Sequence, residues 1–143
     1  MSDITIDTNV FVHALNPEEI RNSASLNLLQ TLLSTTCKIV IDIGFDMDES
    51  KNKSLIGAEY LKHLPPGSLP YAIVADLAQN GRISFVEKST QPHISKKINQ
   101  TLRNRRDRTF IIVCINSERK TLVTHDYEDF NSEKRKFFKK EFQ

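Results

Sequence analysis

The chain has 143 residues, of which 38% are hydrophobic and 27% charged, and its formal net charge at pH 7 is only +2. This composition is that of a globular domain long enough to bury one core. No apolar run approaches the roughly 20 residues that a membrane helix needs, so we expect no membrane association.

Strand and helix patterns alternate in the first part of the chain. Residues 3–6 are β-branched and apolar at alternate positions, which predicts a strand. The motif NPEE at 16–19 combines a cap, a proline and two acids, and predicts a helix over 17–33. The apolar face of this helix is expected to carry Leu26, Leu29, Leu32 and Leu33. Residues 38–43 predict a second strand, buried on both faces.

The middle of the chain continues the alternation. Residues 44–53 are polar and acidic and are interpreted as a solvated loop, because they lack the glycine and glutamate spacing of a calcium loop. Two helices are predicted next, over 54–64 and over 70–79, the second ending near Gly81. Residues 83–86 predict the third strand.

The last part contains a polar, basic stretch and then two apolar elements. We assign no helix or strand to residues 92–105. Residues 106–116 predict a helix that is apolar nearly all round and therefore buried, and residues 121–124 predict the fourth strand. Phenylalanines at roughly helical spacing indicate a helix over 132–143.

Strands that alternate with helices imply an α/β fold, a three-layer α/β/α domain with a mostly parallel central sheet. We expect residues 1–143 to form a single domain. No further strand pattern follows residues 121–124, which leaves two alternatives: a sheet that is short at one edge, or a truncated C-terminus.

The two cysteines lie in apolar runs. This favours buried free thiols at Cys37 and Cys114, as in a reducing compartment, and we expect a cytoplasmic protein. The N-terminal residues lack the basic and apolar segments of a secretory signal. No cysteine and histidine spacing indicates zinc.

Three aspartates stand at the ends of predicted elements. Asp7 and Asp126 follow the first and fourth strands, and Asp107 opens the late buried helix. Sites in open α/β sheets form beyond the carboxyl ends of strands, near the point where the strand order reverses. Carboxylates gathered there repel one another unless a cation joins them, and Mg²⁺ or Mn²⁺ prefers oxygen ligands. Such a site can activate water for attack on a phosphodiester.

The segments around these aspartates resemble the PIN domain, a fold of many toxin ribonucleases and RNA-processing nucleases. The resemblance spans Ile4 to about Phe130 and depends on the order and spacing of three segments. They are DTNVFVHAL at 7–15, LIGAEYLKHL at 55–64 and DRTFIIVCINSERKTLVTHDYEDF at 107–130. The sequence departs from the family pattern in an extra acidic loop, Asp42 to Glu49, and in its last strand, which is missing or unrecognisable.

The resemblance implies a particular site and activity. The metal-binding and catalytic acids would be Asp7, Glu59, Asp107 and Asp126. Supporting positions would be Asn9, Thr124 and the less consistently ligating Asp129. The implied activity is that of a Mg²⁺- or Mn²⁺-dependent endoribonuclease. A small domain of this kind is often the toxin of a toxin–antitoxin pair, so an antitoxin protein is an expected partner, and homodimers are common.

Each acid also has a simpler interpretation. Asp7 could cap a helix, Asp126 could begin a turn, and Asp107 could cap its helix or pair with a neighbouring arginine. Glu59 could lie on a solvated helix face, with Glu49 as the rival acid. A surface role is the simpler interpretation of His125.

A basic run leads into Asp107. It contains six lysine and arginine residues between Lys88 and Arg106 and no acid. Such a cluster beside a metal site would hold a phosphate backbone, although a solvated loop is the alternative. The residues expected to bind RNA are Lys96, Lys97, Arg103, Arg105 and Arg106.

Other functions have weaker support. A catalytically silent PIN-like module that binds nucleic acid or protein is the main alternative, although retention of all four acids argues against it. A receiver-like domain would need an acidic neighbour for Asp7. A nucleotide-binding enzyme would need a glycine-rich loop that the sequence lacks.

Overall fold

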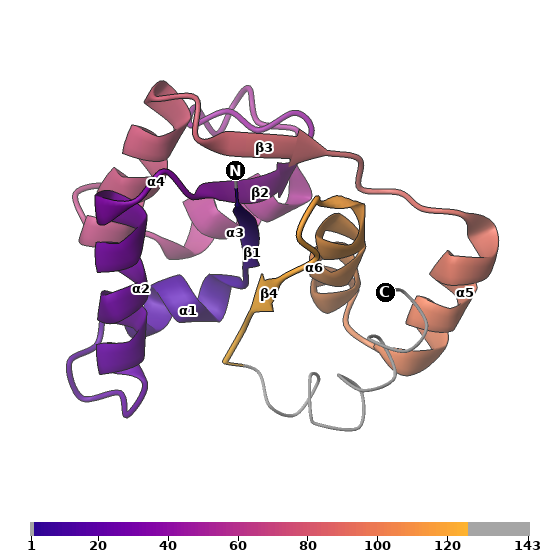
Figure 1. The fold of residues 1–143 in the computed structure, drawn as a ribbon, viewed down its shortest axis with the longest axis horizontal. Helices are drawn as coiled ribbons and strands as arrows, with labels where there is room; N and C mark the ends of the chain where they lie inside the picture. The colour runs from indigo at the N-terminus through magenta and orange to yellow at the C-terminus, as the bar shows by residue number, and fades with distance from the viewer. Residues whose placement is uncertain (1, 126–143) are drawn as a thin grey trace.

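The computed structural model describes residues 2–125. Asp126, Asp129 and the helix predicted over 132–143 lie outside this range, as does any later strand. The elements in chain order are β1 Asp3–Ile6, α1 Thr8–His13, α2 Asn22–Ser34, β2 Lys38–Asp42, α3 Leu55–His63, α4 Leu69–Gln79, β3 Ile83–Val86, α5 Pro92–Thr101, α6 Arg105–Asn116 and β4 Leu122–Val123 (Figure 1).

The four strands of the described region form one parallel sheet in the order β3-β2-β1-β4. The chain moves from β1 to β2 and β3 in one direction and then returns to place β4 on the other side of β1. Right-handed crossovers put helices on opposite faces in this topology. In Figure 1, α2 and α4 lie on one side of the strands and α6 on the other. The predicted α/β fold with a parallel sheet is confirmed, and the helices are compatible with three layers.

The strand order therefore reverses beside β1. This is the place where open α/β sheets form their sites, because the connections from neighbouring strands leave on opposite faces and open a crevice. β1 pairs with β4 through Thr5 opposite Leu122 and Ile6 opposite Val123. The residues that follow these two strands, beginning with Asp7 and Thr124, consequently share one edge of the sheet.

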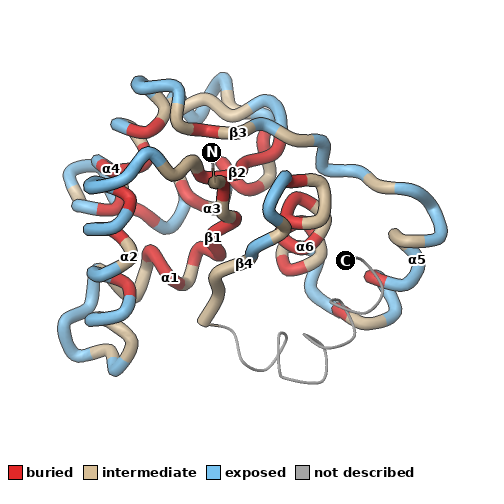
Figure 2. Tube along the Cα trace, in the orientation of Figure 1, coloured by how far each residue is buried: buried red, intermediate tan, exposed pale blue. Residues whose placement is uncertain are grey.

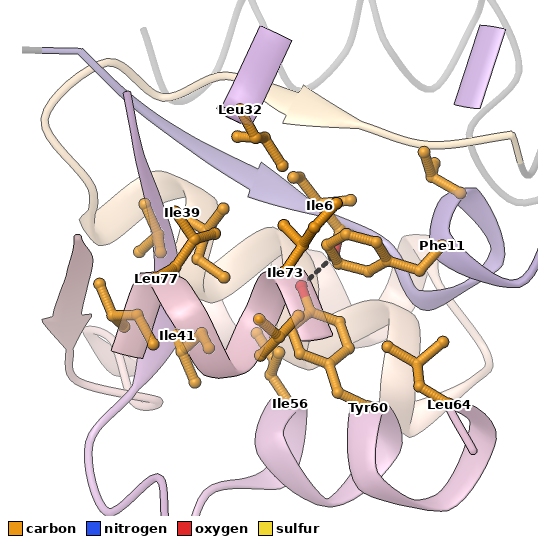
Figure 3. Packing of buried hydrophobic residues seen from close by; sticks show 14 of the residues in the cluster. Ile6, Phe11, Leu32, Ile39, Ile41, Ile56, Tyr60, Leu64, Ile73 and Leu77 are labelled. Atoms are coloured by element: carbon orange, nitrogen blue, oxygen red, sulfur yellow. Dashed lines mark hydrogen bonds between the residues drawn. The ribbon is translucent and has the colours of Figure 1, made fainter. Parts of the chain in front are cut away.

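The main core lies between the sheet and the helices. Ile6, Phe11 and Tyr60 are at most 1% exposed, and the Phe11 and Tyr60 rings meet edge to face with centroids 5.1 Å apart. The Tyr60 hydroxyl donates a hydrogen bond to the carbonyl of Ile6, the last residue of β1 (Figure 3). Helix α3 is thus tied to the end of the central strand, directly before Asp7.

The helix predicted over 17–33 begins later, at Asn22. The Asn16 side chain accepts a hydrogen bond from the Glu18 amide at 3.1 Å, and the Asn16 carbonyl accepts one from Glu19. A second turn then links the Glu19 carbonyl to the Asn22 amide. The side-chain bond competes with helix formation, so the start signal at 16–19 makes turns. In the helix itself, Leu29 and Leu32 are buried, but Leu26 and Leu33 are exposed.

Two helices fall where none was predicted. The short helix α1 follows β1 directly, and α5 lies within the basic stretch. Helix α5 is mostly exposed, as its pale blue colour in Figure 2 shows. It packs on α6 through Ile98 and Leu102, which form a second small core with Ile111.

Both cysteines are free, as predicted, but only Cys114 is buried, while Cys37 is half-buried. Within residues 2–125, no helix combines the length and apolar character needed to cross a bilayer.

Candidate functional site

Asp7 lies at the carboxyl end of β1 and is fully buried. It occupies the N-cap position of α1, but its side chain makes no cap hydrogen bond. Its Oδ2 atom instead accepts a hydrogen bond of 2.8 Å from the Thr124 hydroxyl. Next to it, the Asn9 side chain accepts a hydrogen bond of 3.1 Å from the His125 amide. The two predicted supporting residues therefore join the ends of β1 and β4, and Asp7 stands at the N-cap position without capping α1 through its side chain.

Asp107 lies in the first turn of α6 and is also fully buried. The cap of this helix is Asn104, whose side chain accepts from the Arg106 amide at 2.8 Å. One turn after Asp107, on the same helix face, Phe110 lies with its ring centroid 6.4 Å from that of Tyr60. Because Tyr60 bonds to the residue before Asp7, this contact places the start of α6 beside the end of β1.

Glu59 and Asp107 are connected by Arg106. The Arg106 guanidinium lies 3.9 Å from Glu59 Oε2 and 3.7 Å from Asp107 Oδ1. Glu59 is 26% exposed and also lies 3.3 Å from His63. Glu59 thus faces the site, whereas the rival Glu49 is exposed in the loop. The arginine pairing that was weighed for Asp107 is present, and it extends to Glu59.

Tyr60 is a member of this edge that the sequence analysis missed. Burial raises its pKa well above the usual range, and the nearby carboxylates of Asp7 and Asp42 raise it further. The phenol therefore stays protonated and acts as a hydrogen-bond donor to the Ile6 carbonyl. Its effect on the site is to fix the backbone that carries Asp7.

Asp42, at the end of β2, is a third buried carboxylate and was missed as well. Its oxygens accept hydrogen bonds from the Ser54 hydroxyl at 2.5 Å and from the amides of Leu55 at 2.8 Å and Ile56 at 3.0 Å. The carboxylate therefore caps α3, where the helix dipole favours an anion. Asp42 was predicted as part of the buried strand over 38–43, and this is confirmed, although the extra acidic loop was counted from this residue and it was given no role of its own.

The oxygen donors at this edge are of the kind that Mg²⁺ and Mn²⁺ prefer. Among residues 2–125, however, no three histidine, cysteine, aspartate or glutamate side chains gather closely enough to hold a metal ion. The predicted ligand set includes Asp126, which lies outside the described residues. The cation therefore stays a prediction, and Asp7 and Asp107 are the described aspartates that would hold it.

The basic residues divide into two groups. Lys96 and Lys97 are exposed on α5, and Arg103 is exposed at its end. Arg105 and Arg106 instead line a hollow of about 330 Å³ between α3 and α6, here called the Glu59 hollow. The residues that line it are Leu55, Ile56, Ala58, Glu59, Asn104, Arg105, Arg106, Thr109 and Phe110.

His125, expected at the surface, is half-buried against His13. The two rings stack with centroids 4.9 Å apart, and their Nδ1 atoms are 2.7 Å apart. One Nδ1 must donate and the other must accept, so at least one ring is neutral. Burial, and next the adjacent His13, lower the pKa of His125.

Comparisons with known proteins leave the family open. No family model matches the chain, and no match was found among curated proteins or among solved structures.

Proposed function

We propose that the chain is a PIN-like endoribonuclease that depends on Mg²⁺ or Mn²⁺. The observation that carries the proposal is the burial of Asp7 and Asp107 on adjacent elements at the carboxyl edge of the sheet. Two buried carboxylates are costly unless cations or hydrogen bonds compensate them. A third buried acid, Asp42, receives hydrogen bonds from the start of α3.

The proposed roles follow from these positions. Asp7 and Asp107, with Asp126, would hold the cation, and Thr124 orients the Asp7 carboxylate. Glu59 borders the hollow between α3 and α6, where it can orient a water molecule or accept its proton. The bound cation would neutralise phosphate charge and acidify water.

Arg106 gives the alternative function a specific basis. Its guanidinium lies between Glu59 and Asp107, where it compensates their charge without a metal. A PIN-like module that keeps the fold and binds nucleic acid or protein without catalysis would suit this arrangement. If the domain is a nuclease, Arg106 must move or share the site when a cation binds.

A toxin role, with an antitoxin protein and a homodimeric state, belongs to the same proposal. It depends on the resemblance alone, so a partner is best sought by purifying the chain together with the product of its neighbouring reading frame.

The proposal is tested by incubating RNA with the protein in Mg²⁺ or Mn²⁺, with and without chelator. We expect cleavage that chelator stops and that Asp7→Asn and Asp126→Asn abolish. Cleavage unaffected by all three changes would indicate a contaminant. No cleavage of RNA or DNA, together with no metal binding, would favour the silent module.

A further inference from the structure

A second hollow lies next to the Glu59 hollow, and its lining residues are more positively charged. It has a volume of about 370 Å³ and is called here the Lys88 hollow. The residues that line it are Leu55, Lys88, Asn99, Arg105, Arg108, Thr109 and Ile112. Three of them are cations and none is an acid. Cations that converge on one hollow repel one another, and a bound anion would relieve that repulsion.

The position of Lys88 is fixed by helix α6. The Asn116 side chain donates hydrogen bonds to the carbonyls of Glu87 at 2.7 Å and Ser89 at 3.0 Å. The backbone on both sides of Lys88 is therefore attached to the last turn of α6. This places Lys88 just beyond the carboxyl end of β3, on the same edge of the sheet as Asp7.

Arg108 is held from the side of α5. Its Nη1 atom donates to Asn99 Oδ1 at 3.2 Å, and Nη2 lies 3.4 Å from the Arg103 carbonyl. Its Nε atom is buried and makes no hydrogen bond within residues 2–125. The Arg108 guanidinium is thus held at the hollow that it lines by its contacts with Asn99 and Arg103.

The two hollows are adjacent. Leu55, Arg105 and Thr109 line both of them, so Arg105 lies between the hollow that contains Glu59 and the hollow that contains Lys88 and Arg108. A strand whose scissile phosphate lay at Asp7 and Asp107 could therefore run past Arg105 into the Lys88 hollow. Lys96, Lys97 and Arg103 line neither hollow.

We propose that Lys88, Arg105 and Arg108 form a binding site for a backbone phosphate of single-stranded RNA, next to the phosphate that is cleaved. This rests on the proposed function for the nature of the ligand. Lys88 and Arg108, which were not in the predicted RNA-binding set, are its defining members. The site fixes the register of the strand and reads no base, because phosphate contacts carry no sequence information.

The test measures RNA binding without catalysis. A fluorescent single-stranded RNA of roughly a dozen nucleotides is titrated in chelator, from about 50 to about 200 mM salt. We expect the Lys88→Gln, Arg108→Gln double variant to bind about tenfold more weakly at the lowest salt, with a salt slope reduced by about 0.7 to 1. The matched control is Lys38→Gln with Arg119→Gln, a lysine and an arginine at the amino ends of β2 and β4, and it should keep the parent slope.

Four outcomes decide the matter. A salt slope reduced as expected in the double variant, with a parent-like melting temperature and rescue by Lys88→Arg with Arg108→Lys, supports the site. An unchanged slope overturns it, even if the parent cleaves RNA. In a third outcome, the double variant keeps the salt slope of the parent, and inorganic phosphate at equal ionic strength raises the melting temperature of the parent but not that of the variant. The hollow would then bind free phosphate, and its assignment to an RNA strand would be overturned. Absence of cleavage by the parent, together with a reduced slope in the double variant, would overturn the nuclease proposal alone.

Discussion

The Thr124 hydroxyl donates a hydrogen bond of 2.8 Å to the Asp7 carboxylate, although the two residues are 117 positions apart. The bond joins the end of β4 to the end of β1, at the point where the strand order reverses. Asp7, which is expected to bind the cation, is thus oriented by the residue that follows the last described strand. Asp126, the other expected ligand in this part of the chain, comes two residues after Thr124 in the sequence.

Thr124→Val should destabilise the fold, because it leaves a buried carboxylate oxygen without its hydroxyl donor. We expect the free energy of unfolding in urea to fall by about 1 to 3 kcal/mol. The matched control is Thr121→Val, since the exposed Thr121 hydroxyl bonds only weakly to the Arg119 carbonyl, at 3.3 Å. Its effect should stay within about 0.5 kcal/mol. Equal losses for both variants would mean that the Asp7 contact contributes nothing to stability.

Asp42→Asn should also destabilise the protein, but without a direct effect on the site. The amide cannot accept all the hydrogen bonds from Ser54, Leu55 and Ile56, so the part of the α3 capping that Asp42 provides is lost at a cost of about 2 kcal/mol or more, while Ser54 keeps its bond to the Gly57 amide. Asp48→Asn, in an exposed turn, is the control, and its change in unfolding free energy should be small. A melting temperature unchanged by Asp42→Asn would refute the capping role.

Arg106→Gln should make the site depend more on a bound divalent cation, because the variant lacks the guanidinium that compensates the charge of Glu59 and Asp107 in the parent. Without the guanidinium, Glu59 and Asp107 lose a cation that lies 3.9 Å and 3.7 Å from their oxygens, so the metal-free variant should melt at a lower temperature than the parent. Added Mn²⁺ should then raise the melting temperature of the variant more than that of the parent. Arg103→Gln, at an exposed position, should respond as the parent does. A smaller response to Mn²⁺ in Arg106→Gln would show that the arginine helps the metal bind.

Cys114 should make stability depend on alkaline pH. Burial, and next the carboxylate of Asp3, raise its pKa to about 12 from the ordinary 9.0. The thiol therefore has a higher pKa in the folded than in the unfolded protein. The contribution of the neutral thiol to the free energy of unfolding is fully present below pH 9.0 and is lost as the pH rises toward about 12. Unfolding at a series of pH values should show a steeper alkaline loss for the parent than for Cys114→Ala. Identical profiles would exclude the thiol as a source of the loss.

The parts of the fold that could be predicted are those coded by local pattern. Short β-branched runs predicted the four strands of residues 2–125, and the late apolar run predicted the helix that Asp107 opens. Helix α5 was missed because its apolar side consists of little more than Ile94 and Ile98, spaced four apart among polar and basic residues. The helix start was misplaced because the Asn16 side chain makes a local turn.

The site could be predicted only in its outline. Asp7 was found because it ends a strand, but Asp42 ends a strand too, and its partners lie 12 to 14 residues away. The neighbouring sequence does not distinguish an aspartate that caps a helix, such as Asp42, from one that is proposed to bind a cation, such as Asp7. The position of Arg106 between Glu59 and Asp107 depends on how α3 packs against α6, which is a tertiary contact that no spacing encodes.

The central claim is that the buried acids of this edge hold a divalent cation, and calorimetric titration with Mn²⁺ tests it most directly. The parent and Glu49→Gln, which removes an exposed loop carboxylate, should bind Mn²⁺ alike, while Asp7→Asn and Asp107→Asn should lose the binding and remain folded. A parent that binds no Mn²⁺, or two aspartate variants that bind it as the parent does, would contradict the claim.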